Sequence, residues 1–157
     1  MLNLFVYDNH LTYREGVKHL LEIKIPNCKV SVFGDIYKKE LEAMNILPDL
    51  VIVDPTFGYE KTLHIIDFYV EKEIKVVLLS SYERDREKVL TLLQKDISGY
   101  LVKTMETTDL LKYLNSILNG GRYIHPIVAN VLLDFFHNSN RLKNKGLTSN
   151  NKVVTIY

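Results

Sequence analysis

The sequence predicts a doubly wound α/β fold, in which helices cover both faces of a five-stranded parallel sheet. Short apolar runs recur without polar alternation, a pattern typical of strands that are buried on both faces. Longer segments between them carry apolar residues at helical spacing. The two kinds of segment alternate five times, which favours right-handed strand–helix–strand units over an α+β arrangement.

The predicted elements follow one another with clear boundaries. In the first helix Val17, Leu20 and Leu21 share one face, Pro26 and Asn27 follow its end, and Gly120-Gly121 closes the fifth helix. We predict strands at Leu4–Tyr7, Lys29–Phe33, Leu50–Val53, Val76–Leu79 and Gly99–Val102, alternating with helices at Tyr13–Glu22, Tyr37–Met44, Glu60–Glu71, Asp85–Lys95 and Asp109–Leu118.

An extra helix is predicted after this repeat. Pro126 suits a first helical position, and apolar residues recur at helical spacing from Ile127 to Phe136. From His137 to Thr148 the sequence is rich in Asn, Ser, Lys and Arg, which is typical of a linker. We therefore divide the chain into a domain at 1–120, a linker helix at 121–137 and, at 138–157, a flexible linker that leads into an incomplete further domain.

Composition narrows the function classes. The apolar content of 46% supports a buried core, and a net charge of +1 gives no overall reason to bind nucleic acid. Arg141, Lys143 and Lys145 form a basic cluster that we interpret as a solvated tail. Cys28 is the single cysteine, and no apolar run reaches the ~18 residues of a membrane helix, so we expect a cytoplasmic protein that contacts no membrane.

Polar residues follow four of the predicted strands, where a parallel sheet of this kind binds its ligands. Two carboxylates, an amide, two hydroxyls and an ammonium are thereby predicted to share one edge: Asp8, Asn9, Asp54, Ser80, Ser81 and Lys103. Asp8 and Asp54 suit a hard cation such as Mg²⁺, and Asp54 can act as a nucleophile toward phosphorus. Lys103 and Ser80 would then stabilise the oxygens of a phosphoryl group.

The ordered motifs resemble a known family. Leu4–His10, Arg14-Glu15-Gly16, Pro48–Asp54 and Gly99–Lys103 look like the receiver domain of a bacterial two-component response regulator. Residues 119–126, Asn-Gly-Gly-Arg-Tyr-Ile-His-Pro, are similar to the segment that joins receiver and helix-turn-helix domains in the NarL/LuxR subfamily. The resemblance implies a flavodoxin-like sheet with the strand order 2-1-3-4-5.

The resemblance also implies a role for each matching residue. Asp54 would be the phosphoacceptor, and Asp8, Asn9, Asp54 and the Thr56 carbonyl would form the acidic Mg²⁺ pocket. Ser80 would be the switch hydroxyl, Tyr100 the switch aromatic and Lys103 the phosphate-sensing ammonium. Ser81 is an alternative for the switch role, although Ser80 directly follows the strand.

Asn9 departs from the family pattern, which has two adjacent acids at positions 8 and 9. An amide oxygen supplies a dipole without a charge, so we expect weak Mg²⁺ binding. The formal charge of Asp8, Asp54 and Lys103 sums to −1, and we expect weak phosphorylation or signalling without phosphate. His10 is expected to be an exposed loop residue, since no second His or Cys lies at metal-ligand spacing.

The leading functional hypothesis is a receiver that controls transcription through homodimerisation, with a histidine kinase or small phosphodonor as partner. Segment 106–136 is the candidate dimer contact. DNA would be bound only through a helix-turn-helix domain, and the chain ends where such a domain would begin. We expect that the chain has been shortened or that the natural protein has lost this module.

The sequence was also compared with what two other classes of protein require. The first is a phosphorylation-independent pseudo-receiver that acts as a protein-interaction module. The second is an aspartate-nucleophile phosphatase, which requires an acid two residues after the nucleophile. Thr56 occupies that position here. Without that acid no general acid/base is available for turnover, so we expect that the chain is not an enzyme.

Overall fold

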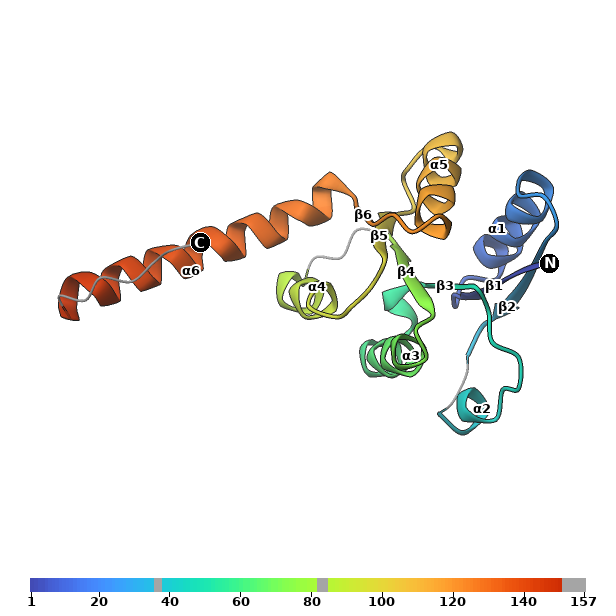
Figure 1. Ribbon diagram of the computed structural model, residues 1–157, viewed down its shortest axis with the longest axis horizontal. Coiled ribbons are helices and arrows are strands. Elements are labelled where there is room, and N and C mark those ends of the chain that lie inside the picture. The colour runs from blue at the N-terminus through green and yellow to red at the C-terminus, as the bar shows by residue number, and fades with distance from the viewer. Residues whose placement is uncertain (36–37, 82–84, 151–157) are drawn as a thin grey trace.

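The computed structural model describes residues 1–35, 38–81 and 85–150. Within them the strands form one parallel sheet in the order β2-β1-β3-β4-β5-β6 (Figure 1). The strands are β1 (Leu2–Tyr7), β2 (Cys28–Phe33), β3 (Leu50–Val53), β4 (Lys75–Ser80), β5 (Gly99–Val102) and β6 (Tyr123–Ile124). The predicted α/β class and the central order 2-1-3-4-5 are therefore confirmed.

The prediction of five strands was wrong by one, because β6 adds a sixth strand at the edge of the sheet. It pairs in parallel with β5, with Gly99 opposite Tyr123. Gly99 allows close packing here: a Cβ at this position would lie 2.7 Å from Ile117 Cδ1. β6 is only two residues long, too short for an apolar periodicity to appear in the sequence.

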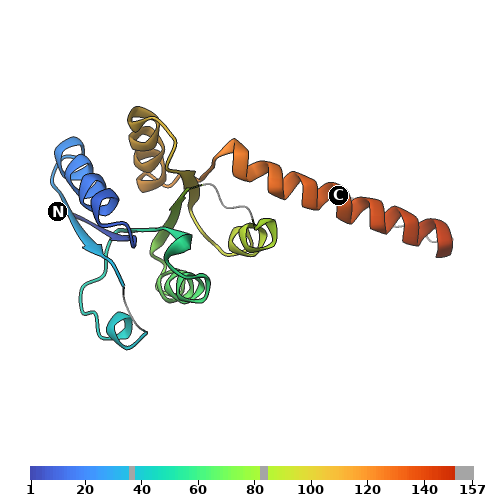
Figure 2. The same cartoon turned by 180° about the vertical axis from the view of Figure 1, so that it is seen from behind.

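Helices cover both faces of the sheet, as Figures 1 and 2 show from opposite sides. α1 (Leu11–Lys24) and α5 (Thr107–Leu118) lie on one face, and their apolar residues form one buried cluster with inward side chains of the sheet. α2 (Lys38–Glu42), α3 (Tyr59–Glu71) and α4 (Arg86–Leu93) supply the cluster on the other face. A short 3-10 turn, η1 (Pro55–Phe57), links β3 to α3.

The strands are buried as their apolar composition predicts. Every residue of β3 and β5 is buried, since helices pack on both faces of the sheet. On the face of α3, the hydroxyls of Tyr7 and Tyr69 lie 2.6 Å apart and both contact Met44 Sδ. This pairing satisfies two phenol groups in a site that excludes water, and burial raises the pKa of both tyrosines.

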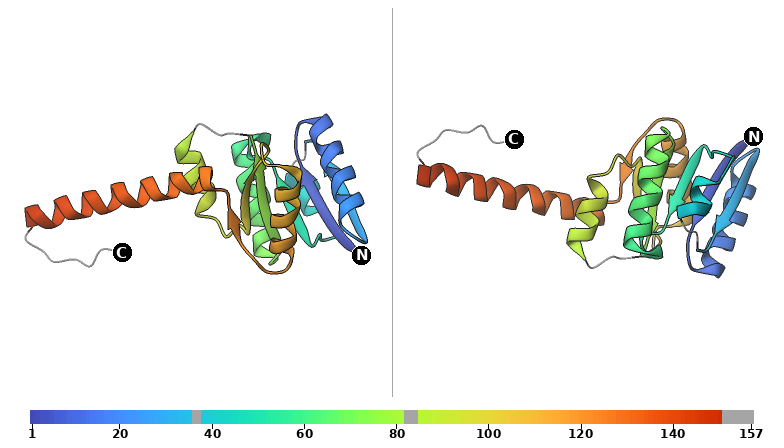
Figure 3. Two further views of the ribbon diagram at one scale, coloured as in Figure 1. Left: turned by 90° about the horizontal axis from the view of Figure 1, so that it is seen from above. Right: turned by 90° about the horizontal axis from the view of Figure 1, so that it is seen from below.

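The last helix differs from its prediction. α6 (Pro126–Asn150) begins at the predicted proline, but its backbone stays helical over residues 138–150, where the composition predicts a linker. Local composition is a weak predictor here, because Asn, Ser and Lys are also tolerated in a solvated helix. α6 projects away from the sheet in both views of Figure 3. Its first turns pack against α4, where Val128 is buried and Arg86 forms an ion pair with Asp134.

Two further expectations concern residues that lie partly outside the described part of the chain. Helix α2 is shorter than its predicted range, and Tyr37, its predicted first residue, lies outside the described residues. Residues 151–157, part of the predicted start of a further domain, also lie outside them. None of the described helices combines the length and apolar character needed to cross a membrane.

Candidate functional site

The site lies at the carboxyl edge of the sheet, just past the ends of β1, β3 and β5, with β4 between the last two. The ladder continues one residue past each strand: Asp8 N donates to Phe33 O, Asp54 N to Tyr7 O and Lys103 N to Ser80 O. In the register of the sheet Asp54 therefore lies beside Asp8, whereas Lys103 lies two residues further along, after the pair formed by Ser80 and Val102. Both aspartates are only 2% exposed.

Lys103 joins the two carboxylates. Its Nζ lies 2.7 Å from Asp8 Oδ2 and 2.6 Å from Asp54 Oδ2, and its side chain is 10% exposed. The structure thus brings together three residues that are 46 and 49 positions apart in the chain. Because two buried carboxylates repel each other, the ammonium between them is a structural requirement as well as a possible ligand for a third anion.

The two oxygens of Asp54 have different surroundings. Oδ1 accepts hydrogen bonds from Thr56 N at 2.9 Å and from Thr56 Oγ1 at 2.8 Å. Oδ2 faces Lys103 and the interior of the site. Thr56 thereby fixes the carboxylate through one oxygen and leaves the other directed at the pocket, which is the arrangement that an oriented nucleophile needs.

His10 is the exposed loop residue that the sequence predicts, but its contacts with this site were not predicted. Its Nδ1 lies 3.0 Å from Asp8 Oδ1 and 3.7 Å from Asp54 Oδ2, while its side chain is 62% exposed. The backbone N–H of His10 also donates to Asp8 Oδ1 at 2.8 Å. The sequence contained one signal for this contact: an Asp in a turn often accepts a hydrogen bond from the backbone N–H two residues later.

Tyr13 is a second residue that sequence reasoning missed. Lys103 Nζ lies 4.1 Å from the centre of its ring, within the range of a cation–π contact. Burial, followed by the negative charges of Asp8 and Asp54, raises the pKa of Tyr13 to about 12. The phenol therefore stays neutral beside the carboxylates.

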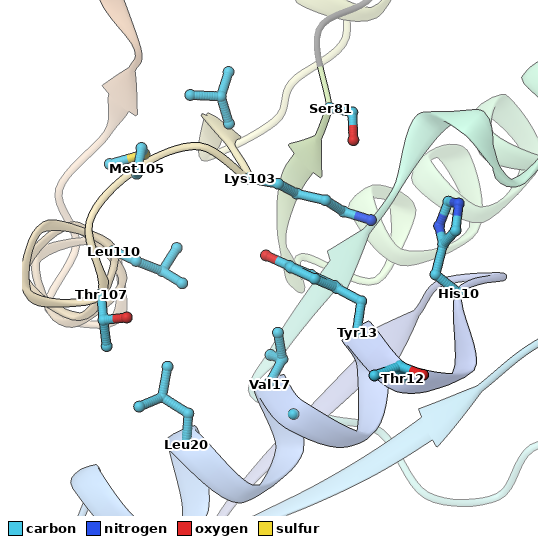
Figure 4. A pocket seen from close by; sticks show the side chains of 12 residues that line it. His10, Thr12, Tyr13, Val17, Leu20, Ser81, Lys103, Met105, Thr107 and Leu110 are labelled. Carbon is cyan, nitrogen blue, oxygen red and sulfur yellow. The ribbon is translucent and has the colours of Figure 1, made fainter.

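A cavity of about 590 Å³ opens beside Lys103, between α1 and the segment that leads into α5 (Figure 4). Val17, Leu20 and Leu110 form apolar walls, and His10 and Lys103 stand at the end nearest the carboxylates. The cavity is thus lined by Lys103 and His10, two residues that contact the buried carboxylates.

The predicted switch residues lie along the next edge of the site. Ser80 is 1% exposed and lines a second cavity of about 230 Å³ with the buried Tyr100 and with Val128 of α6. Ser81 is exposed and lines both cavities, so it shares the larger one with Lys103. Of the two serines, Ser81 is thus the one that lines a cavity together with Lys103. Their switch roles stay predictions.

Asn9 is exposed in the bend between β1 and α1. The amide adds no charge, so the formal charge of Asp8, Asp54 and Lys103 is −1. Oxygen donors on two facing carboxylates fit a hard divalent cation such as Mg²⁺. Asp8, Asp54 and His10 each offer one ligand atom for a metal ion, and these atoms lie within 4.8 Å of one another.

Known proteins similar to this chain are bacterial regulators. The transcriptional regulatory protein DegU of Brevibacillus brevis is 31% identical over 137 residues, which cover 84% of this chain and 56% of DegU. The nitrate/nitrite response regulator protein NarL of Escherichia coli (strain K12) is 30% identical over 133 residues, which cover 82% of this chain and 60% of NarL. The chain therefore spans a little more than half the length of these relatives. No known protein-family model matches it.

Solved structures of response regulators have the same fold as this chain. A two-component response regulator of the LuxR family from Aurantimonas sp. SI85-9A1 superposes with a TM-score of 0.67 at 23% identity, covering 84% of this chain and 95% of that one. The isolated REC domain of RcsB from Salmonella enterica serovar Typhimurium, in the presence of the phosphomimetic BeF3−, also gives 0.67 at 20% identity, covering 83% and 97%. The chain is thus a homologue of two-component response regulators of the LuxR/NarL/DegU family and has the fold of their receiver domains.

Proposed function

We propose that the chain is a receiver that accepts a phosphoryl group on Asp54. Phosphorylation would then change how a surface of the chain binds its partner. The observation that carries the proposal is the position of Asp54 Oδ2, which is held 2.6 Å from Lys103 Nζ while Oδ1 is fixed by Thr56. A carboxylate with one fixed oxygen and one directed at an ammonium is suited to attack phosphorus.

The chemical step balances within this geometry. Asp54 Oδ2 forms a bond to phosphorus while the bond from phosphorus to the donor breaks, and the leaving group takes that electron pair. Lys103 would then pair with an oxygen of the new acyl phosphate, and Ser81, which lines the same cavity as Lys103, would donate a hydrogen bond to another. Bound Mg²⁺ would neutralise phosphoryl charge, with Asp8 and Asp54 as ligands and the Asn9 and Thr56 oxygens as further candidates.

Regulation of transcription through dimerisation is part of the same proposal. The homologues named above are transcriptional and response regulators, and the donor would be a histidine kinase or a small phosphodonor. DNA would be bound only through a helix-turn-helix domain. Segment 106–136 remains the candidate dimer contact, since Ile127, Leu133 and Phe135 of α6 are between 43% and 54% exposed.

A pseudo-receiver that acts without phosphate is the second candidate, and one feature favours it. Asn9 replaces an acid, and Lys103 already pairs with both remaining carboxylates. The pocket is therefore close to electrostatic balance without a bound cation, so phosphorylation would relieve less repulsion than in a pocket with three acids.

Intact-mass spectrometry after incubation with acetyl phosphate and Mg²⁺ tests the proposal. We expect partial addition of one phosphoryl group, its loss in Asp54→Asn and its retention in the control Asp67→Asn, which removes an exposed carboxylate of α3. Asn9→Asp restores the adjacent acid and should raise the labelled fraction. A chain that stays unlabelled both as wild type and as Asn9→Asp would refute phosphoacceptance and leave the pseudo-receiver.

A further inference from the structure

Two carboxylates and one imidazole lie close together at one point of the pocket. Nδ1 of His10 lies 3.0 Å from Asp8 Oδ1 and 3.7 Å from Asp54 Oδ2, and one donor atom from each of the three residues lies within 4.8 Å of the others. The set combines a nitrogen with two oxygens, whereas a magnesium pocket uses oxygen ligands.

These separations match those between ligands of one metal ion. Two adjacent ligands of an octahedral ion lie about 3 Å apart when each is about 2.1 Å from the metal. Tetrahedral ligands at about 2.0–2.1 Å lie roughly 3.4 Å apart. The distances from His10 Nδ1 to the two carboxylates bracket this range. The shorter of the two is a hydrogen bond in this structure, and an ion bound to Nδ1 would replace it.

The chemistry of the donors decides which ion fits. Imidazole suits Zn²⁺, Co²⁺, Fe²⁺ and Ni²⁺, while Mg²⁺ prefers carboxylate, carbonyl and water oxygens. Asn9 weakens the oxygen-only alternative because an amide carries no charge. We propose that this pocket binds a first-row transition-metal dication in preference to Mg²⁺, with His10 Nδ1, Asp8 and Asp54 as its ligands. The inference deepens the proposed function, because it names the metal of the same site.

Neighbouring groups hold the two carboxylates in place and leave coordination positions open to water. Asp54 Oδ1 is fixed by Thr56, and Asp8 Oδ1 accepts the backbone N–H of His10, so both carboxylates are oriented before any ion arrives. The His10 ring is 62% exposed and lines the large cavity, which leaves room for water to complete the coordination.

Lys103 is the competitor that a metal ion has to displace. Its ammonium lies within 2.7 Å of both carboxylates, so a dication at this point would repel it. The ring of Tyr13, 4.1 Å from Nζ, offers an electron-rich face that can hold the ammonium beside the carboxylates. Binding would change the formal charge of the group formed by Asp8, Asp54 and Lys103 from −1 to +1, which prepares the site for an anion.

Cobalt titration of the whole chain tests this inference without a phosphodonor. Co²⁺ reports nitrogen ligation through its visible absorption bands, and Mg²⁺ is added as a competitor. We expect Co²⁺ to bind more tightly than Mg²⁺, and His10→Ala to weaken Co²⁺ by about tenfold or more, since even changes outside the ligand shell reach this size. Mg²⁺ affinity should change much less than Co²⁺ affinity in His10→Ala, because for Mg²⁺ the substitution removes only a neighbour of the Asp8 carboxylate. His19→Ala, which removes an exposed imidazole of α1, is the matched control.

The outcomes separate this inference from the proposed function. His10 makes no side-chain capping bond to the described backbone of α1, so its removal should leave the fold intact. If His10→Ala binds Co²⁺ with wild-type affinity and spectrum, the inference is overturned, even if Mg²⁺ and acetyl phosphate still label Asp54. If Co²⁺ binding depends on His10 but Asp54 is never labelled, the metal site stands and phosphoacceptance fails.

Discussion

Replacement of Lys103 by methionine is the sharpest test of the pocket electrostatics. The substitution keeps the length of the side chain and removes its charge. In the wild type Nζ lies 2.6 and 2.7 Å from carboxylates whose side chains are 1% and 3% exposed. Removing one partner of a buried ion pair typically costs about 3–5 kcal/mol, because it leaves the other charge buried and uncompensated.

We therefore expect Lys103→Met to lower the free energy of unfolding by about 3–5 kcal/mol, measured by urea denaturation and circular dichroism. This is a large fraction of the ~5–15 kcal/mol that stabilises a typical domain. Lys95→Met is the matched control: Lys95 pairs with Asp67 at 3.0 Å, but the Asp67 side chain is 59% exposed, so the expected loss is at most about 1 kcal/mol.

A double-mutant cycle identifies the origin of the loss. Asp54→Asn removes one of the two facing carboxylates, so it should recover part of the stability lost in Lys103→Met, with a coupling energy of about 0.5–3 kcal/mol. Equal losses in Lys103→Met and Lys95→Met, or strict additivity of Lys103→Met and Asp54→Asn, would refute the conclusion that the ammonium holds the pocket together.

Two further predictions address the fold and the neighbour of Lys103. Gly99→Ala should destabilise the chain by about 1–3 kcal/mol in urea denaturation, because its Cβ would lie 2.7 Å from a side-chain atom of α5. In Gly16→Ala nothing lies within 4 Å of the new Cβ, and this helical position should gain up to about 1 kcal/mol, so equal effects would contradict the packing argument. The folded pKa of Tyr13, about 12 against 10.0 for the free phenol, means that its stabilising contribution is complete below pH 10 and is lost as the pH rises to 12. Stability from pH 9 to 12, compared with Tyr13→Phe, checks this, and identical slopes would disprove it.

Much of the fold was predictable from local patterns. Fully apolar runs such as Leu50–Val53 indicate a strand that is covered on both faces, and all four residues are buried. The five main strands and their order follow from this pattern and from the resemblance to receivers. β6 was missed because two residues carry no periodicity. The length of α6 was missed because its second half is polar, and composition alone does not separate a solvated helix from a linker.

The candidate site was predictable to a different degree for each residue. Asp8, Asp54 and Lys103 directly follow strands, so the rule that loops converge at the carboxyl edge of a parallel sheet is sufficient to place them together. His10 and Tyr13 do not follow a strand directly. Their positions depend on how the turn after Asp8 folds back and on which face of α1 is directed at the pocket, and single-residue patterns do not contain this information.

The sequence by itself determined the kind of fold, the edge of the sheet where polar residues gather and the loss of an acid at Asn9, because these follow from the order of residue types along the chain. Only the tertiary structure decided that Lys103 bridges two buried carboxylates, that Asp54 directs Oδ2 inward and that His10 joins the carboxylates as a third donor. Those facts depend on distances between side chains of different strands and loops, and such distances are set when the helices pack and the strands come into register.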